Sequence, residues 1–181
     1  MSRIGRLPIN IPNGVTVNVD ENNNVTVSGK LGTLTQKVDK IIKVEVKDNE
    51  VVLTRPNDTT DVKAKHGLYR VLVNNMVKGV TEGFTKTIII NGVGYKANKQ
   101  GNKVVLNIGF SHPVELVEEP GITLECPDMT TLVVKGISKE QVGQYAAKVR
   151  GIKPVEPYHA YGLRYDNEVV VRKVGKVSGK K

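Results

Sequence analysis

A pattern of short strands followed by one helix occurs twice along this chain of 181 residues. Shifting the sequence by 80 residues places 51–55 (VVLTR) on 131–135 (TLVVK), and Arg70 on Arg150. The shift also places Val62 on Val142. These identities are few, so the repeated order of elements carries the argument for a duplication. We expect two homologous α+β domains at residues 1–82 and 83–181, each an antiparallel sheet of short strands packed with one helix, although one continuous domain stays open.

The first half alternates apolar and polar residues between positions 10 and 54, with Asn- and Gly-rich turns between the segments. A period of two is typical of antiparallel strands with one buried face. A helix is predicted next, because Asp58 is a candidate N-cap and Gly79 a candidate stop. Its buried face should consist of Val62, Tyr69, Leu72, Val73, Met76 and Val77.

The second half repeats this plan, with a helix from the capping-box pair Ser138 and Gln141 to Gly151. The helix and the strands before it hold most of the apolar periodicity, so we expect the core to survive without the chain after Tyr158. We expect a strand-like segment at 168–171 to add some stability. The predicted strands lie at 85–90, 95–99, 103–110, 114–119, 122–127 and 131–136, and the buried helical stripe is Val142, Tyr145, Ala146 and Val149.

The charge of the chain points to a polyanionic partner. Lys and Arg number 27 against 18 Asp and Glu, which gives a net charge of +9 and attracts nucleic acid or an anionic membrane surface. No apolar run approaches the roughly 20 residues that a membrane-spanning helix needs, and the first residues lack a secretory pattern. We therefore expect a cytoplasmic protein. Cys126 is the only cysteine and has no cationic neighbour, which favours a structural thiol.

Positive charge is concentrated at the two ends. Residues 104–134 contain no Lys or Arg but five acidic residues, whereas residues 135–181 contain eleven basic and four acidic residues. A smaller basic site is the N-terminal arm, where Arg3 and Arg6 flank Gly5, a residue expected to be flexible. Basic ends of this kind suit grooves in folded RNA.

Two motifs that could indicate an enzyme lack the required context. Gly92, Gly94 and Ala97 have dinucleotide-fold spacing, but a strand, a turn and another strand are predicted after them instead of a helix. We expect these glycines to allow a bulge from which Tyr95 and Lys96 project. Ser111 and His112 are adjacent without a nucleophile elbow, and the three histidines show no metal spacing. We expect no catalytic residue, metal or cofactor.

Aromatic and basic residues alternate in the C-terminal segment. Tyrosine can stack on an unpaired base, and arginine can bind a phosphate with two hydrogen bonds. The alternative is a solvated basic tail whose tyrosine rings pack in the local core. The alternating residues are Tyr158, Tyr161 and Tyr165 with Arg164, Arg172, Lys173 and Lys176.

At this point the sequence resembles the bacterial L-six family of large-subunit ribosomal proteins over essentially its whole length. The matching segments are SRIGRLPINIP, VTVSGKLGTL, NGVGYKA, LNIGFSHPVEL, VKGISKEQVGQYAAKVRGIKPVEPY and GLRYDNEVVVRKVGK. One departure stands out, because the family pattern Lys-Gly-Lys-Gly is replaced here by residues 159–162, HAYG. Because His159 and Tyr161 stand where the family has lysines, the family's phosphate contacts do not carry over to these two positions.

The resemblance implies two duplicated α+β domains, no catalysis, and binding to 23S ribosomal RNA near the sarcin-ricin loop and the stalk base, where elongation factors dock. Neighbouring ribosomal proteins are further expected partners. A non-ribosomal basic RNA-binding module is the alternative, and a nucleotide-dependent enzyme is the rival from another class. The expected RNA contacts are Arg3, Arg6, Tyr95, Lys96, Lys148, Arg150, Lys153, Tyr158, Arg164, Arg172, Lys173 and Lys176.

Overall fold

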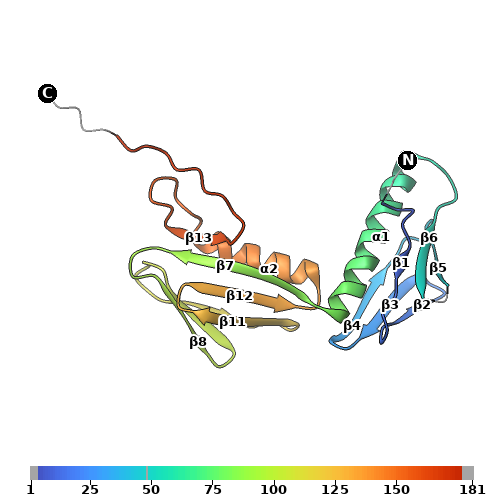
Figure 1. Cartoon of the computed structure of the whole chain (residues 1–181), viewed down its shortest axis with the longest axis horizontal. Helices are drawn as coiled ribbons and strands as arrows, with labels where there is room; N and C mark the ends of the chain where they lie inside the picture. The colour runs from blue at the N-terminus through green and yellow to red at the C-terminus, as the bar shows by residue number, and fades with distance from the viewer. Residues whose placement is uncertain (1–3, 48, 177–181) are drawn as a thin grey trace. The chain divides into compact units, whose positions relative to one another are not determined.

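The computed structural model describes residues 4–47 and 49–176 (Figure 1). Internal contacts divide the chain into a first unit, which ends at Phe84 and includes Ile137–Lys139, and a second unit formed by the remainder. Each unit combines small antiparallel sheets with one helix, which confirms the expected fold class. The division at residue 82 stays a prediction about independent folding, because internal contacts do not show that either part folds alone.

The first unit contains two three-stranded sheets and the helix α1 (Thr60–Thr81). One sheet has the order β1-β6-β5, from Ile9–Asn10, Glu50–Thr54 and Lys43–Lys47. The other has the order β2-β3-β4, from Thr16–Val19, Asn24–Gly29 and Gly32–Lys37. Every strand pair is antiparallel, and alternate residues such as Val25 and Val27 of β3 face the core.

Helix α1 differs from the prediction at both ends. Thr59 is its N-cap, while the Asp58 carboxylate pairs with Arg55 at 2.7 Å instead of capping. The helix continues past Gly79, because Gly83 adopts the left-handed conformation that ends it, with φ of 75°. Four of the six expected face residues are buried, Tyr69 and Leu72 are partly buried, and His66 joins the buried face.

The second unit contains the helix α2 (Lys139–Ile152) and two further sheets. The whole expected stripe of α2 is buried, which confirms that prediction. One sheet has the order β10-β9-β8, from Val114–Val117, Lys103–Asn107 and Lys96–Gln100. The other has the order β11-β12-β7-β13, from Ile122–Asp128, Thr131–Gly136, Phe84–Asn91 and Gly162–Tyr165.

The two units repeat one arrangement. The β5–β6 hairpin corresponds to β11–β12, and the antiparallel series β2-β3-β4 corresponds to β8-β9-β10. Each unit then continues into its helix, where Val62 and Val142, equivalent under the 80-residue shift, are both buried. The structure therefore confirms the duplication, and the alternative of one continuous domain is wrong.

The core includes part of the chain after Tyr158, so the expectation that it would survive without this part is wrong. Strand β13 pairs with β7, and Leu163 within it is fully buried, so removing this chain would remove part of the core. The strand-like segment at 168–171 is not a strand, and its Val169 and Val171 are 88% and 82% exposed. The backbone leaves the sheet because a turn follows Tyr165. The Glu168 carboxylate accepts a hydrogen bond from the Tyr165 backbone amide and stabilises this turn.

Candidate nucleic-acid interface

Four acidic side chains of the second unit pair with lysines. These pairs are exposed or half-exposed, so each contributes little to stability. They nevertheless neutralise the charge of these four lysines, so the uncompensated positive charge of the unit lies on other residues. The pairs are Lys103–Glu115, Lys99–Glu118 and Lys148–Glu119, each at 3.0 Å, and Lys135–Glu125 at 2.6 Å.

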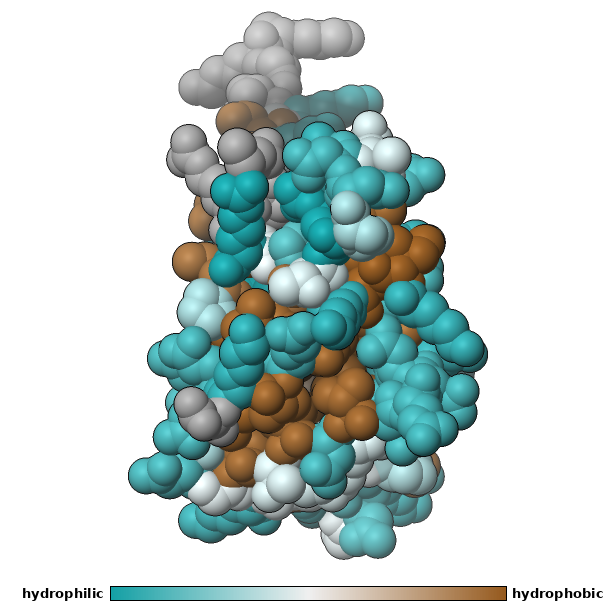
Figure 2. All heavy atoms as spheres, turned by 90° about the vertical axis from the view of Figure 1, so that its right-hand side faces the viewer, coloured by the Kyte–Doolittle hydropathy of each residue, from teal (hydrophilic) through white to brown (hydrophobic). Residues whose placement is uncertain are grey.

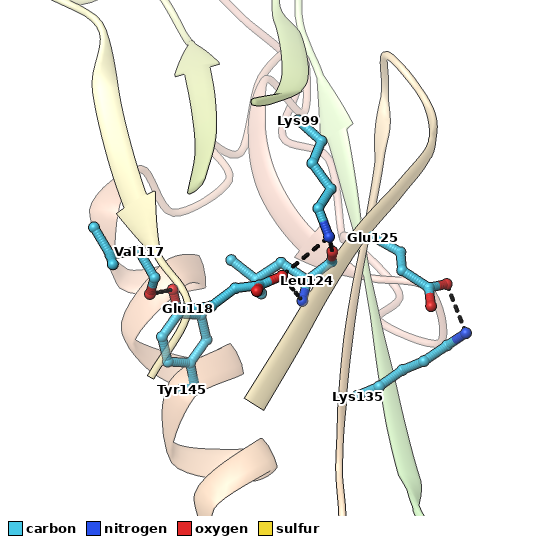
Figure 3. Close-up of polar contacts among 7 residues, drawn as sticks. All are labelled: Lys99, Val117, Glu118, Leu124, Glu125, Lys135 and Tyr145. Atoms are coloured by element: carbon cyan, nitrogen blue, oxygen red, sulfur yellow. Dashed lines mark hydrogen bonds and ion pairs between the residues drawn. The ribbon is translucent and has the colours of Figure 1, made fainter. Parts of the chain in front are cut away.

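Glu118 is central to the polar network that Figure 3 shows. Its carboxylate accepts hydrogen bonds from the Leu124 amide at 2.9 Å and from Lys99 at 3.0 Å, and these bonds lower the pKa of Glu118. The Tyr145 hydroxyl donates to the Val117 carbonyl at 2.7 Å, and burial foremost raises the pKa of Tyr145 to about 12. These groups join β10, β11 and α2, so they serve the fold.

Exposed cations remain in the segment that follows β13. Arg172, Lys173 and Lys176 are all exposed, and within residues 4–47 and 49–176 no carboxylate forms an ion pair with them. The segment is held in place by its backbone, because the Lys173 amide donates to the Pro157 carbonyl at 2.8 Å. It therefore presents uncompensated positive charge from a fixed point on the second unit.

Arg150 holds the beginning of this segment in place through hydrogen bonds to Glu168. Its guanidinium donates two hydrogen bonds to Glu168, one from Nε to Oε2 at 2.7 Å and a second from Nη2 to Oε1. The same carboxylate accepts the Tyr165 amide at 3.1 Å, and Arg164 donates to the Glu168 carbonyl at 3.3 Å. The Tyr165 ring lies 5.7 Å from the Arg150 guanidinium carbon. In the free protein, Arg150 thus positions the basic segment.

The Arg150 hydrogen bond, supported by the Tyr165 amide, lowers the pKa of Glu168 below its ordinary 4.5. The pair therefore stabilises the fold at pH values above 4.5, and this contribution is lost as the pH falls through the lower folded-state pKa. We expect the melting temperature of Glu168→Gln to depend less on pH below 4.5 than that of the unmodified chain. Calorimetry across this range measures the difference, and parallel curves would contradict the coupling.

Lys153 is engaged within the protein. Its Nζ donates to the Ile108 carbonyl at 2.6 Å and lies 4.7 Å from the Tyr95 ring centroid and 4.9 Å from that of Phe110. Tyr95 is half-buried, so its ring packs against Lys153 instead of projecting freely. Its neighbour Lys96 is exposed at the start of β8. Of the two residues expected to project, Lys96 alone is fully available at the surface.

The turn after Pro154 is organised by one carboxylate. Glu156 accepts the backbone amides of Tyr158 at 2.7 Å, His159 at 2.6 Å and Tyr161 at 3.2 Å. Burial raises the pKa of Glu156, but these three amides outweigh it and hold the pKa below its ordinary value. Tyr158 is 52% exposed at the edge of the turn. The Pro157 carbonyl joins this turn to the basic segment.

The N-terminal arm is more fixed than its sequence indicated. Arg6 is exposed, but Gly5 is buried so closely that an added Cβ would lie 2.5 Å from the His66 ring, which corrects the expectation of flexibility. Arg70 donates from Nε to the Leu7 carbonyl at 3.2 Å and from Nη2 to that of Pro8 at 3.3 Å. Arg3 lies outside the described residues.

One face of the first unit is shown in Figure 2, where apolar side chains gather between hydrophilic ones. Large apolar residues are exposed on this unit, including Leu68 and Val71 of α1. Some lysines of the unit are compensated, since Lys65 pairs with Asp39 at 2.5 Å and Lys43 with Glu45 at 2.8 Å, whereas the exposed Lys30, Lys37 and Lys40 form no ion pair with a described residue. The basic segment of the second unit differs from these lysines in carrying three exposed cations within five residues.

The motifs considered for catalysis have structural explanations. Gly92 and Gly94 lie in the turn between β7 and β8, and they are followed by β8, a turn at 101–102 and β9, which confirms the strand, turn and strand expected after them. His112 is exposed and its ring stacks on Phe110 at a centroid distance of 6.3 Å.

Among the described residues, no group of His, Cys, Asp or Glu could hold a metal ion. None of their helices is long and apolar enough to cross a membrane. Burial raises the pKa of the Cys126 thiol.

The comparison with known families agrees with the duplicated fold. The family described as Ribosomal protein L6 matches this chain twice, over residues 11–83 and again over residues 91–166. The chain belongs to the ribosomal protein L6 family. Because this is a family of structural ribosomal proteins, membership confirms that the chain is not an enzyme.

Curated relatives from three bacteria match the L6-family chain along its length, and each is named large ribosomal subunit protein uL6. The protein of Thermoanaerobacter sp. (strain X514) is 53% identical over 181 residues, all of both chains. That of Desulfitobacterium hafniense is 52% identical over all of this chain and 98% of its own length. That of Clostridium acetobutylicum is 52% identical over 97% of this chain and 98% of its own.

In this L6-family chain the predicted contact residues fall into separate groups. Tyr158, Arg164, Arg172 and Lys173 are brought together by the bonds of Pro157 and Glu168, whereas Arg6 lies in the first unit. Glu156 and Glu168 were missed as organising residues, because acidic residues in a basic segment indicate repulsion of phosphate. Lys86 was also missed, although it is exposed and lies 5.3 Å from the Tyr165 ring centroid. Because it lies in a predicted strand, the sequence gave no indication that it would be near the RNA-binding residues.

Proposed function

We propose that this chain is a structural component of the large ribosomal subunit and binds its 23S ribosomal RNA mainly through the second unit. The uL6 names of the relatives support the assignment to that subunit. The observation that carries the RNA face is the separation of charge. Acidic residues compensate Lys99, Lys103, Lys135 and Lys148, while the cations of residues 172–176 remain uncompensated.

The binding mechanism is electrostatic anchoring. Arg172, Lys173 and Lys176 neutralise phosphates and release the cations condensed around the RNA. The Pro157 carbonyl and the Arg150–Glu168 pair hold the segment in place before it binds. It therefore loses less chain entropy on binding RNA than an unattached flexible tail would. Because of the family resemblance, we expect this contact to lie near the sarcin-ricin loop and the stalk base, close to the elongation-factor docking site. Arg3 and Arg6 would contact a second RNA segment or a neighbouring ribosomal protein.

A non-ribosomal basic RNA-binding module has the same charge pattern but no subunit to join. Cosedimentation of the purified full-length chain with large subunits in high-magnesium buffer separates the two functions. We expect comigration with the subunit, and crosslinks from residues 158–176 to 23S RNA. Binding to free RNA without subunit association would favour the alternative. Crosslinks confined to the first unit would overturn the location of the RNA face.

A further inference from the structure

Two aromatic rings stack on each other at the exposed tip of the 156–162 turn. The His159 and Tyr161 centroids lie 5.4 Å apart with an angle of 20° between the ring planes. The His159 side chain is 72% exposed, and Tyr161 as a whole is 36% exposed. A stacked pair in the core would be explained by packing, but this pair has a large surface in contact with solvent.

The backbone beneath the rings is fixed before any ligand arrives. The Glu156 carboxylate accepts the amides of both ring residues, and the Glu156 amide donates to the Tyr161 carbonyl at 3.0 Å. Ala160, which separates the two ring residues in the sequence, is buried and adopts the left-handed conformation with φ of 63°. Its carbonyl accepts a hydrogen bond from the Asn91 side chain at 2.7 Å. A ligand that stacks here therefore orders few additional torsions.

The surroundings decide which flat ligand fits. The Lys173 amide bonds to the Pro157 carbonyl, so the exposed cations Arg172 and Lys173 belong to the adjoining segment. A cationic group such as an arginine side chain would meet like charge there. A nucleobase stacks on aromatic rings of either kind, and its own backbone supplies the phosphates for these cations.

We propose that the His159–Tyr161 pair is a stacking site for one unpaired nucleobase of the bound RNA. This inference rests on the proposed RNA-binding function and adds a contact at the positions where the family resemblance expects lysines. Stacking and charge differ in their dependence on salt, because each phosphate contact contributes about 0.7 to 0.9 to the slope of log K against log salt. A stacked base contributes affinity without that slope.

The test compares four full-length chains binding to 23S RNA across a salt series. His159→Ala with Tyr161→Ala removes both rings and should weaken binding by about tenfold to a hundredfold with an unchanged salt slope. His159→Phe with Tyr161→Phe keeps both rings and should bind like the unmodified chain. His159→Lys with Tyr161→Lys should steepen the slope by about 1.4 to 1.8. Circular dichroism confirms that each variant is folded.

Zero-length ultraviolet crosslinking supplies a direct readout, since it requires a base in contact with the ring. We expect crosslinked nucleotides on peptides containing His159 or Tyr161. Two results would overturn the stacking site while leaving the proposed function intact. One is an unaltered affinity of the double alanine variant, and the other is a smaller slope of log K against log salt in that variant. An unmodified chain that does not bind 23S RNA would overturn the proposed function and this inference with it.

Discussion

Replacing Arg172, Lys173 and Lys176 with alanine in the full-length chain lowers its affinity for 23S RNA by about a hundredfold at 0.1 M salt. Three lost phosphate contacts also reduce the slope of log K against log salt by roughly two to three. These side chains are exposed and form no ion pair with the described acidic residues, so the melting temperature should barely change. Arg164 is left intact because it donates to the carbonyls of Tyr165 and Glu168.

A matched control removes the same charge from the first unit. Lys30, Lys37 and Lys40 are exposed, so their replacement with alanine changes the net charge equally. This triple variant should keep most of the affinity and most of the salt slope. Filter binding or fluorescence anisotropy at several salt concentrations measures both quantities. Equal losses in the two triple variants would show that net charge alone, and not the 172–176 segment, determines binding.

Replacing Gly162 with alanine destabilises the second unit by about 3 kcal/mol. An added Cβ would lie 2.7 Å from the Pro154 carbonyl oxygen and 2.8 Å from the Val155 Cα, and both neighbours are backbone. Gly162 also has φ of 136°, a conformation that strains any residue with a side chain. For a domain of this size, the melting temperature should fall by about 15 °C.

Gly143 provides the opposite case within the same unit. It lies inside α2, and an added Cβ would meet no atom within 4 Å. Gly143→Ala should therefore stabilise the helix by about 0.5 to 1 kcal/mol. Differential scanning calorimetry of the two full-length variants compares opposite effects of one added methyl group. Equal melting temperatures would contradict the close approach of β13 to residues 153–155.

Most of the fold was predictable because alternation and helical spacing follow directly from burial. Strands β7 to β12 and the buried stripe of α2 were found this way. Strand β1 has two residues, too few for a period. Strand β13 was missed because its pairing with β7 joins residues about 70 positions apart, and no local pattern records such a partner. The end of α1 depended on which nearby glycine adopts positive φ.

The candidate site was predictable in its charge but not in its organisation. Counting basic residues located the C-terminal segment, because long-range electrostatics depends on composition. Whether a cation is available depends on its partner in space, and sequence did not show that Lys153 binds the Ile108 carbonyl or that Glu168 holds Arg150. The His159–Tyr161 stack was equally hidden, since it requires the turn that Glu156 organises.

Arg70 and Arg150 occupy equivalent positions in the two copies of the helix, and each holds a terminal part of the chain. Arg70 binds the carbonyls of Leu7 and Pro8, which precede the first copy, and Arg150 binds Glu168, which follows the second. The same helix position therefore holds an arginine in both copies, with main-chain oxygens as its partners in the first and a carboxylate in the second. The two copies differ in what this arginine binds, and in each of them it ties a segment outside the helix back to the helix.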